Sequence, residues 1–239
     1  MLSKNQIKLI TRLKQKKHRI ADGLFVAEGL KVIDELLDSS IVLHHLFTTT
    51  SYKSFTNSET VITEAELKKI SFLTTPNKAL AIFKIPLSEK VQRLGLIVVL
   101  DSIRDPGNLG TIIRLCDWFG IKELVCSKET VDCFNPKVVQ ATMGSIARVN
   151  INYLDLNTFL AETKLPIFGS FMDGKNVYKS KLPEQGILIM GNEANGISQA
   201  IKQQVGQRIT IPRFGNLQAT ESLNVATATA ILLSEFKRH

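Results

Sequence analysis

Hydrophobic positions in the first third of the chain alternate between helix-like and strand-like spacings. Lys4, Lys8 and Arg12 fall on one face of a predicted N-terminal helix, whereas Ile10 and Leu13 fall on another. The pattern continues with a strand at 24–28, a helix over 30–37, a strand at 41–47, a helix opened by the capping box Thr63-x-x-Glu66, and a strand at 79–85. These elements predict a small α/β domain.

Continuous apolar runs mark the strands of the remaining chain. They lie at 94–100, 123–126, 166–171, 186–190 and 208–212, with helical stretches between them. Strands that are apolar on both sides are typical of a parallel sheet covered by helices on both faces. We therefore expect an α/β domain over 94–239 and a smaller one over 1–88, with a boundary where Pro86 and a polar run interrupt the pattern.

Charge points to a polyanionic partner. The net charge is +8, and residues 1–31 hold eight Lys or Arg against two acids. A solvated basic helix and a phosphate-binding surface explain this run equally well. The 239 residues, 44% of them hydrophobic, contain no apolar run near the length of about eighteen that spans a membrane. The charged N-terminus does not resemble a signal peptide, so we expect a cytoplasmic protein.

Cysteine and histidine give no sign of a metal centre. Cys116, Cys126 and Cys133 lack a CxxC spacing, and the four histidines lie far from them in the sequence. We expect the cysteines to be small apolar residues of the core and predict no zinc site and no disulfide framework.

Ligands of parallel sheets bind beyond the carboxyl ends of the strands, so we expect the functional residues in the segments that follow the strands. After the first strand, Asn108 is predicted to cap a helix that ends at Gly120. This helix is apolar over most of its circumference, which predicts that Arg114 is not freely solvated. Arg114 either pairs with Asp117 or is held for a phosphate or carboxylate, and the two alternatives carry equal weight.

The second segment, "GNEANGIS" at 191–198, follows an apolar strand. Gly191 would let a ligand approach the main chain, Asn195-Gly196 is a turn pair, and Ser198 is a candidate N-cap. Turn chemistry does not explain Glu193, an acid at the mouth of a sheet in a basic protein.

The third segment leads from the last strand through a polar loop into the C-terminal helix. Small residues of this helix, Ala226, Ala228 and Ala230, permit close packing, and Ser222 and Asn224 precede it. Helix-start chemistry alone could account for these two polar residues. The chain has no G-x-G-x-x-G after its first strand, no P-loop and no G-x-S-x-G, which removes support for dinucleotide oxidoreductases, nucleotide hydrolases and esterases.

The stretches "NLGTIIRLCDWFG", "IMGNEANGIS" and "IPRFG…ESLNVATATAILLSE" together resemble motifs one, two and three of the SpoU (TrmH-like) RNA 2′-O-ribose methyltransferases of the SPOUT superfamily. The N-terminal "KLITRLKQKKHRIADGLFVAEGLKVIDELL" resembles the substrate-binding domain of many such enzymes. The resemblance implies S-adenosyl-L-methionine as cofactor, a homodimer, a structured RNA substrate, ribosomal in preference to transfer RNA, and a C-terminal trefoil knot, an exception to the rule against threaded chains.

The resemblance also assigns roles to individual residues. The implied catalytic residues are Asn108, Arg114, Glu193, Ser222 and Asn224. The implied cofactor contacts, largely main chain, lie at Gly169, Ser170, Gly191, Ile211 and Leu223. One departure is the stretch 216–221, which is longer than in many relatives and makes the placement of Ile211 and Arg213 less certain than that of Leu223 and Asn224.

The role usually assigned to the motif-one arginine in this family is that of general base, but a guanidinium with a pKa above about 12 is a poor base. We expect Arg114 to clamp a phosphate and stabilise developing charge, and Glu193 to orient a neighbouring basic or amide group without binding metal. Two rivals remain open: a non-catalytic RNA-binding or ribosome-assembly protein on the same fold, and a methyltransferase that acts on a base.

Overall fold

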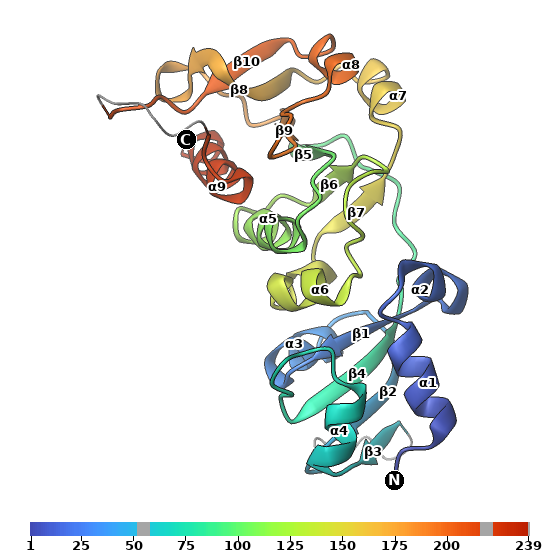
Figure 1. The fold of residues 1–239 in the computed structure, drawn as a ribbon. Coiled ribbons are helices and arrows are strands. Elements are labelled where there is room, and N and C mark those ends of the chain that lie inside the picture. Colours follow the sequence, from blue (N-terminus) through green and yellow to red (C-terminus); the bar gives the residue numbers. More distant parts are fainter. Residues whose placement is uncertain (52–57, 216–221, 239) are drawn as a thin grey trace. The chain divides into compact units, whose positions relative to one another are not determined.

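The computed structural model of the protein describes residues 1–51, 58–215 and 222–238 (Figure 1). The chain forms two compact units: the first combines 1–87 with 132–147, and the second combines 88–131 with 148–239. Segment 132–147 thus folds with the first unit. The predicted domains, 1–88 and 94–239, instead assign this segment to the second. Among the described residues, no helix is long and apolar enough to cross a membrane.

A four-stranded sheet in the order β1-β4-β2-β3 forms the centre of the first unit. Its strands are β1 (Leu24–Glu28), β2 (Leu43–Thr48), β3 (Glu59–Val61) and β4 (Ala79–Lys84). Its helices are α1 (Lys4–Arg12), α2 (Lys16–Asp22), α3 (Leu30–Leu37), α4 (Glu64–Ile70), α6 (Pro136–Thr142) and the 3-10 turn η1 (Ser145–Ala147). The predicted strands and helices of this region are confirmed, and the short β3 is an addition.

Side chains of β1 alternate between the two faces of this sheet, as the two-residue period of a strand requires. Val26 packs into one core cluster with Ile10 of α1 and Ile70 of α4. On the other face, the ring of Phe25 lies 4.8 Å from that of Phe134, which precedes α6. Segment 132–147 therefore belongs to the core of the first unit.

Polar side chains also stabilise the first unit, at the start of α4 and around the buried Arg19. The capping box of α4 is confirmed, because Thr63 accepts a hydrogen bond from the Glu66 N–H and Glu66 bonds back to the Thr63 N–H. Arg19, counted above among the basic residues, is only 2% exposed; it donates to the Leu13 carbonyl at 2.8 Å and from Nε to Asp132 at 3.0 Å. Arg19 is therefore part of the core and not of an anion-binding surface.

The second unit contains a six-stranded, fully parallel sheet in the order β10-β8-β9-β5-β6-β7, as predicted from the apolar runs. Its strands are β5 (Leu96–Asp101), β6 (Glu123–Cys126), β7 (Asn150–Tyr153), β8 (Ile167–Asn176), β9 (Gly186–Gly191) and β10 (Gln207–Thr210). The strand β7 was not predicted, because its sequence NINY has no continuous apolar run.

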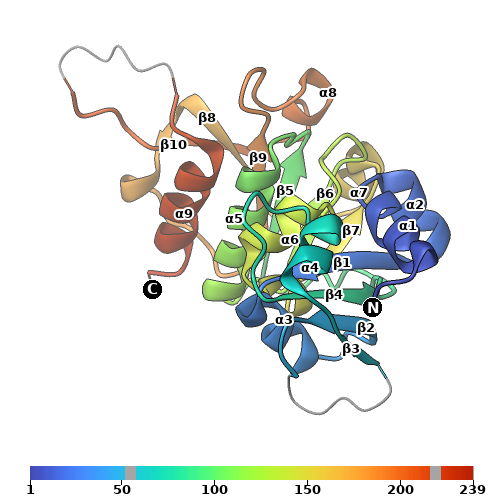
Figure 2. The same ribbon diagram turned by 60° about the horizontal axis from the view of Figure 1, so that its bottom comes forward.

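Helices cover both faces of the parallel sheet (Figure 2). They are α5 (Pro106–Trp118), α7 (Leu156–Ala161), α8 (Gln199–Lys202) and α9 (Val225–Phe236), with the 3-10 turn η2 (Val177–Lys179). Phe159 of α7 and Ile201 of α8 pack with Ile97 and Ile189 of the sheet. Helices α5 and α9 pack against each other. The trefoil knot stays a prediction.

Candidate active site

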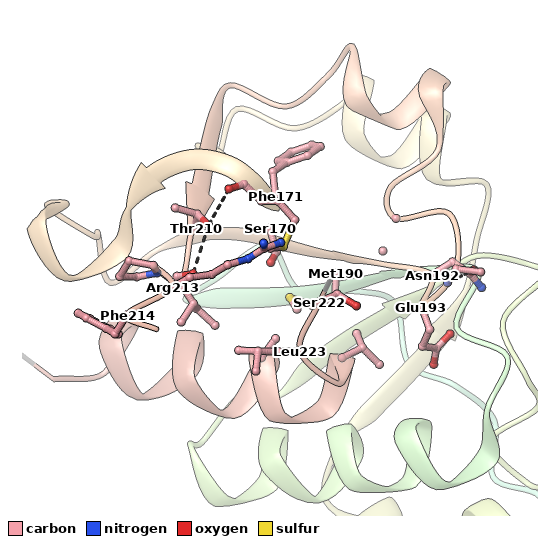
Figure 3. Close-up of a pocket in the computed structure, with 18 of the residues that line it drawn as sticks. Ser170, Phe171, Met190, Asn192, Glu193, Thr210, Arg213, Phe214, Ser222 and Leu223 are labelled. Carbon is pink, nitrogen blue, oxygen red and sulfur yellow. Dashed lines mark hydrogen bonds between the residues drawn. The ribbon is translucent and has the colours of Figure 1, made fainter. Parts of the chain in front are cut away.

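A cavity of about 950 Å³ opens at the carboxyl ends of β9 and β10, as expected for a parallel sheet (Figure 3). It is lined by residues of β8, of the loop after β9, of the segment after β10 and of the start of α9. Of the predicted site residues, its walls include Ser170, Gly191, Glu193, Ile211, Ser222 and Leu223. Gly169, Asn108, Arg114 and Asn224 are not part of the lining.

Three predicted catalytic residues, far apart in the sequence, form one hydrogen-bonded chain at the edge of this cavity. Asn224 Nδ2 donates to Asn108 Oδ1 at 2.9 Å, and Asn108 Nδ2 donates to Glu193 Oε1 at 2.8 Å. The three residues come from the start of α9, the first turn of α5 and the loop after β9. The chain of hydrogen bonds therefore joins the three motifs.

The backbone of α9 fixes the direction of this chain. Asn224 is the N-cap of α9, and its Oδ1 accepts hydrogen bonds from the N–H groups of Ala226 and Thr227. Its amide nitrogen must then face Asn108, whose own nitrogen must face Glu193. Asn224 thus both caps α9 and belongs to the hydrogen-bonded chain of the site. Glu193 is required as the acceptor at the end of this chain.

The prediction that Asn108 caps α5 is wrong. Asp105 is the N-cap, and its carboxylate accepts from the Asn108 N–H at 2.8 Å. An acid three residues before Asn108 competes successfully for the helix start, because Pro106 can then occupy the first helical turn, where its missing N–H is tolerated. The side chain of Asn108 is therefore available for the chain to Glu193.

The glycines after the strands have packing reasons that the sequence did not reveal. A Cβ on Gly191 would lie 2.3 Å from main-chain atoms of Gly196 and Ile197, and a Cβ on Gly169 would lie 2.5 Å from the ring of Phe171. The loop after β9 folds back against Gly191, so the missing side chain is needed whether or not a ligand is bound. Gly191 still lines the cavity with its main chain.

Two residues that hold the loop carrying Glu193, Asn192 and Asp101, were not predicted from the sequence. Asn192 donates from Nδ2 to the Ser102 carbonyl at 2.6 Å, and its Oδ1 accepts from the Ala194 N–H at 2.9 Å. Asp101, buried at the end of β5, accepts from the Ser198 N–H at 2.7 Å. Ser198 stands at the start of α8, but its side chain makes no capping hydrogen bond. Asp101 could have been found as the first acid after a buried strand.

Arg114 does not match either environment expected for it within one chain. Its side chain is exposed, and Asp117 pairs with Arg148 Nε at 2.9 Å instead. Trp118, one helical turn after Arg114, is 83% exposed. The expectation that α5 is buried nearly all round is therefore wrong for this strip of a single chain. The expectation that the cysteines are core residues is confirmed, because Cys116, Cys126 and Cys133 are all buried.

The walls of the cavity are suited to a nucleoside-sized cofactor. Its volume lies within the range of roughly 300–1,000 Å³ typical of small-molecule sites, and apolar Met190, Ile211 and Leu223 provide enclosing surface. Main chain at Gly191 and the side chain of Ser170 add polar groups. Glu193 and Phe214 lie towards opposite ends in Figure 3. The stretch 216–221 lies outside the described residues, which also contain no cluster of metal-ligating side chains.

Comparison with known proteins now assigns this fold and site to a family. The model of the SpoU rRNA Methylase family matches residues 95–234, and that of the MRM3-like substrate binding domain matches residues 4–81. A solved structure from Porphyromonas gingivalis, described as an RNA methyltransferase of the TrmH family, is 37% identical with a TM-score of 0.88, covering 100% of this chain and 99% of that one.

Two further relatives agree. An AdoMet-bound rRNA methyltransferase from Sinorhizobium meliloti is 30% identical with a TM-score of 0.87, over 100% of this chain and 96% of that one. The 23S rRNA (guanosine(2553)-2′-O)-methyltransferase RlmP of Bacillus subtilis is 28% identical over 97% of this chain and 96% of its own. The chain belongs to the SpoU rRNA methylase family. The class predicted from the motifs, an RNA methyltransferase that uses S-adenosylmethionine, is confirmed by this membership.

Proposed function

We propose that the protein transfers a methyl group from S-adenosylmethionine to a ribose 2′-hydroxyl of structured ribosomal RNA, and that it works as a homodimer in the cytoplasm. The B. subtilis and S. meliloti relatives, both named as rRNA methyltransferases, support the ribosomal target. The observation that carries the proposal is the chain Asn224–Asn108–Glu193, which links all three motifs at the edge of a cavity of cofactor size.

Residues of the cavity would hold the cofactor mainly through main chain and apolar surface. Gly191, Ile211 and Leu223 supply these contacts, and Ser170 adds a hydroxyl. Bound S-adenosylmethionine supplies a methyl group on a positively charged sulfonium. Holding the acceptor ribose in line with that group gives much of the acceleration, because a fixed geometry removes translational and rotational entropy from the barrier.

The polar chain orients the RNA-facing groups. Glu193 keeps a second carboxylate oxygen, Oε2, without a hydrogen-bond partner among the described residues, and the exposed Ser222 lines the same cavity. A carboxylate oxygen fixed beside the cavity can accept a hydrogen bond from a ribose hydroxyl and hold it for attack. Glu193 therefore positions the acceptor, and Asn108 keeps Glu193 in place.

Arg114 completes the site from a second copy of the chain. It lies roughly 120° around α5 and about 9 Å along it from Asn108, so both side chains cannot serve one cavity. Arg114 and Trp118 together form an exposed strip on α5. A partner that covers this strip buries Trp118 and brings Arg114 to its own cavity, where the guanidinium clamps a phosphate and stabilises developing negative charge.

Mixed dimers test this arrangement. We expect Arg114→Ala and Asn224→Asp each to lose nearly all activity alone, whereas a statistical mixture of the two subunits regains about a quarter of wild-type activity, because half of the dimers contain one intact site. If Arg114 acts within its own subunit, mixing restores nothing. Arg114→Lys separates the roles further: activity close to wild type would exclude a planar, bidentate clamp.

The first unit captures RNA through phosphates. Lys4 and Lys8 are exposed on α1, whereas Ile10 and Leu13 face the core. Replacing both lysines by alanine should weaken RNA binding for all sequences and lower the salt slope by about one to two, while S-adenosylmethionine affinity is unchanged. Loss of both affinities together would contradict a separate RNA-binding role.

The decisive experiment is methyl transfer in vitro. Purified protein, tritiated S-adenosylmethionine and ribosomal RNA from a strain that lacks the gene should give one 2′-O-methylated nucleotide, mapped by its resistance to alkaline cleavage. Calorimetric titration with S-adenosylmethionine is the companion measurement. A protein that neither binds S-adenosylmethionine nor transfers a methyl group would be the non-catalytic RNA-binding alternative. Methylation found on a base would overturn the ribose assignment.

A further inference from the structure

A second, smaller cavity of about 250 Å³ lies entirely within the first unit. Segments distant in sequence form it: β1, the turn after α4, and α6 from segment 132–147. Its lining consists of Val26, Glu28, Phe72, Leu73, Pro136, Lys137, Gln140 and Ala141. The apolar members provide flat enclosing surface, and Glu28, Gln140 and Lys137 provide polar groups. No motif of the methyltransferase family accounts for this cavity.

Glu28 is the unusual residue of this cavity, because its carboxylate is only 5% exposed and forms no ion pair with any described residue. The Ser71 hydroxyl donates to Oε2, and the Phe72 N–H donates to Oε1 at 2.7 Å. Burial raises the pKa of Glu28, and these two hydrogen bonds only partly oppose that effect. Each oxygen has accepted one hydrogen bond and retains a lone pair, so the carboxylate is fixed and can accept more.

We propose that this cavity binds an unpaired guanine base, held by Glu28. Guanine presents two adjacent donors, N1–H and N2–H₂, which match the two oxygens of one carboxylate. Adenine, cytosine and uracil each place an acceptor beside any donor on the same edge, so the carboxylate repels part of that edge. Phe72 and Pro136 provide the surface against which an unstacked base can lie.

Size and charge favour a base over other ligands. The volume lies below the range of roughly 300–1,000 Å³ for drug-sized ligands and suits a single planar ring system. The buried carboxylate excludes an anionic group from the interior, whereas the exposed Lys137 lies at the rim, where a phosphate of the same nucleotide would remain in water. The unit as a whole carries fourteen Lys and Arg against nine Asp and Glu, which favours a nucleic acid. The role of the cavity in substrate capture rests on the proposed function.

The test is titration of the full-length protein with GMP, AMP, CMP and UMP. Wild type should prefer GMP, and Glu28→Gln should weaken GMP binding at least tenfold, because its amide presents donors to donors. The glutamine can still accept from the Phe72 N–H and donate to Ser71, so the turn should keep its fold. The matched control is Glu123→Gln, which changes another buried glutamate, one that accepts a hydrogen bond from Asn150, and it should leave GMP affinity unchanged.

Filling the cavity gives a second route to the same answer. Ala141→Leu should abolish GMP binding while the unfolding transition remains cooperative. Equal affinity for the four nucleotides, or unchanged GMP affinity in both variants, would overturn the proposal.

Methylation kinetics identify the source of the guanine. A raised KM for RNA with unchanged kcat in Glu28→Gln assigns the cavity to a guanine of the substrate RNA, and an unchanged KM assigns it to a free guanine nucleotide. If no ribosomal RNA is methylated by wild type, the proposed function fails, and the nucleotide titration still decides the cavity.

Discussion

Two acidic side chains, one from each unit, are held in different ways. In the first unit, Asp132 is 14% exposed and pairs with Arg19, a guanidinium almost without solvent contact. In the second unit, Glu193 is exposed and bonds to the neutral amide of Asn108. Breaking a buried ion pair leaves an uncompensated charge, whereas an exposed acid bonded through one oxygen can accept a further hydrogen bond from a substrate hydroxyl or water at little cost. The first arrangement suits a permanent contact, and the second suits a site.

The largest effect is expected from breaking the buried pair. Asp132→Ala should lower the free energy of unfolding by about 3–5 kcal/mol, because Arg19 stays buried with its charge unbalanced. Urea denaturation measures the loss. The control is Asp173→Ala, which breaks the exposed Asp173–Arg208 pair and should cost less than about 1 kcal/mol. Similar losses in the two variants would remove the distinction between the units.

The next effect concerns activity and not stability. Asn224→Asp keeps an oxygen for the α9 cap but offers Asn108 an acceptor in place of a donor, so the amide of Asn108 turns and its carbonyl faces Glu193. We expect kcat to fall about a hundredfold, as for comparable misplacement of a reacting group, with stability nearly unchanged. Asn224→Ala should lose about 1 kcal/mol of stability in addition. Wild-type turnover in the aspartate variant would show that the direction of the hydrogen bonds is unimportant.

A smaller effect is expected at the capping box of α4. Thr63→Ala removes the acceptor for the Glu66 N–H and should cost about 1 kcal/mol, measured by thermal unfolding, while Thr63→Ser should be close to wild type. The hydrogen bonds from Thr63 and Leu2 also lower the pKa of Glu66. Stability from Glu66 is therefore present above its unfolded pKa and is lost as the pH falls through the folded value.

The smallest effect has the opposite sign. Burial raises the pKa of Glu28 above its ordinary value of 4.5. The stability that this shift gives the folded protein is fully present below pH 4.5 and is lost as the pH rises through the folded pKa. Glu28→Gln does not titrate and should flatten this part of the stability profile. Urea midpoints from pH 4 to pH 7, compared between wild type and the variant, make the measurement; parallel profiles would show that Glu28 is not desolvated.

Sequence patterns predicted the parallel sheet and most elements because burial imposes a period on each strand and helix. They failed where competing local contacts decide. Asp105 displaced Asn108 at a helix start, and the folded-back loop, not a ligand, requires Gly191. Arg19 was counted as a surface cation, since nothing near it in sequence announces Asp132, 113 positions later. Single-sequence periodicity contains no information on such pairings.

The candidate site was predictable as a set of residues but not as a geometry. The resemblance named Asn108, Glu193 and Asn224, but only the structure joins them in one directed chain. Their linkage depends on three segments meeting at one sheet edge. The exposure of Arg114 could not be foreseen from a helix that is apolar almost all round, because that pattern does not distinguish burial within a chain from burial against a second copy.

Segment 132–147 makes the polypeptide pass between the units three times, at 87/88, 131/132 and 147/148. A protease that cuts only within 88–94 would therefore leave two fragments that still share a folded core and migrate together until denatured. Deleting residues 1–87 would leave the buried Val138 and Val139 of α6 without the rest of the core of the first unit. Each unit is thus unsuited to expression alone, and recombination between relatives would have to exchange the 132–147 segment together with the N-terminal region.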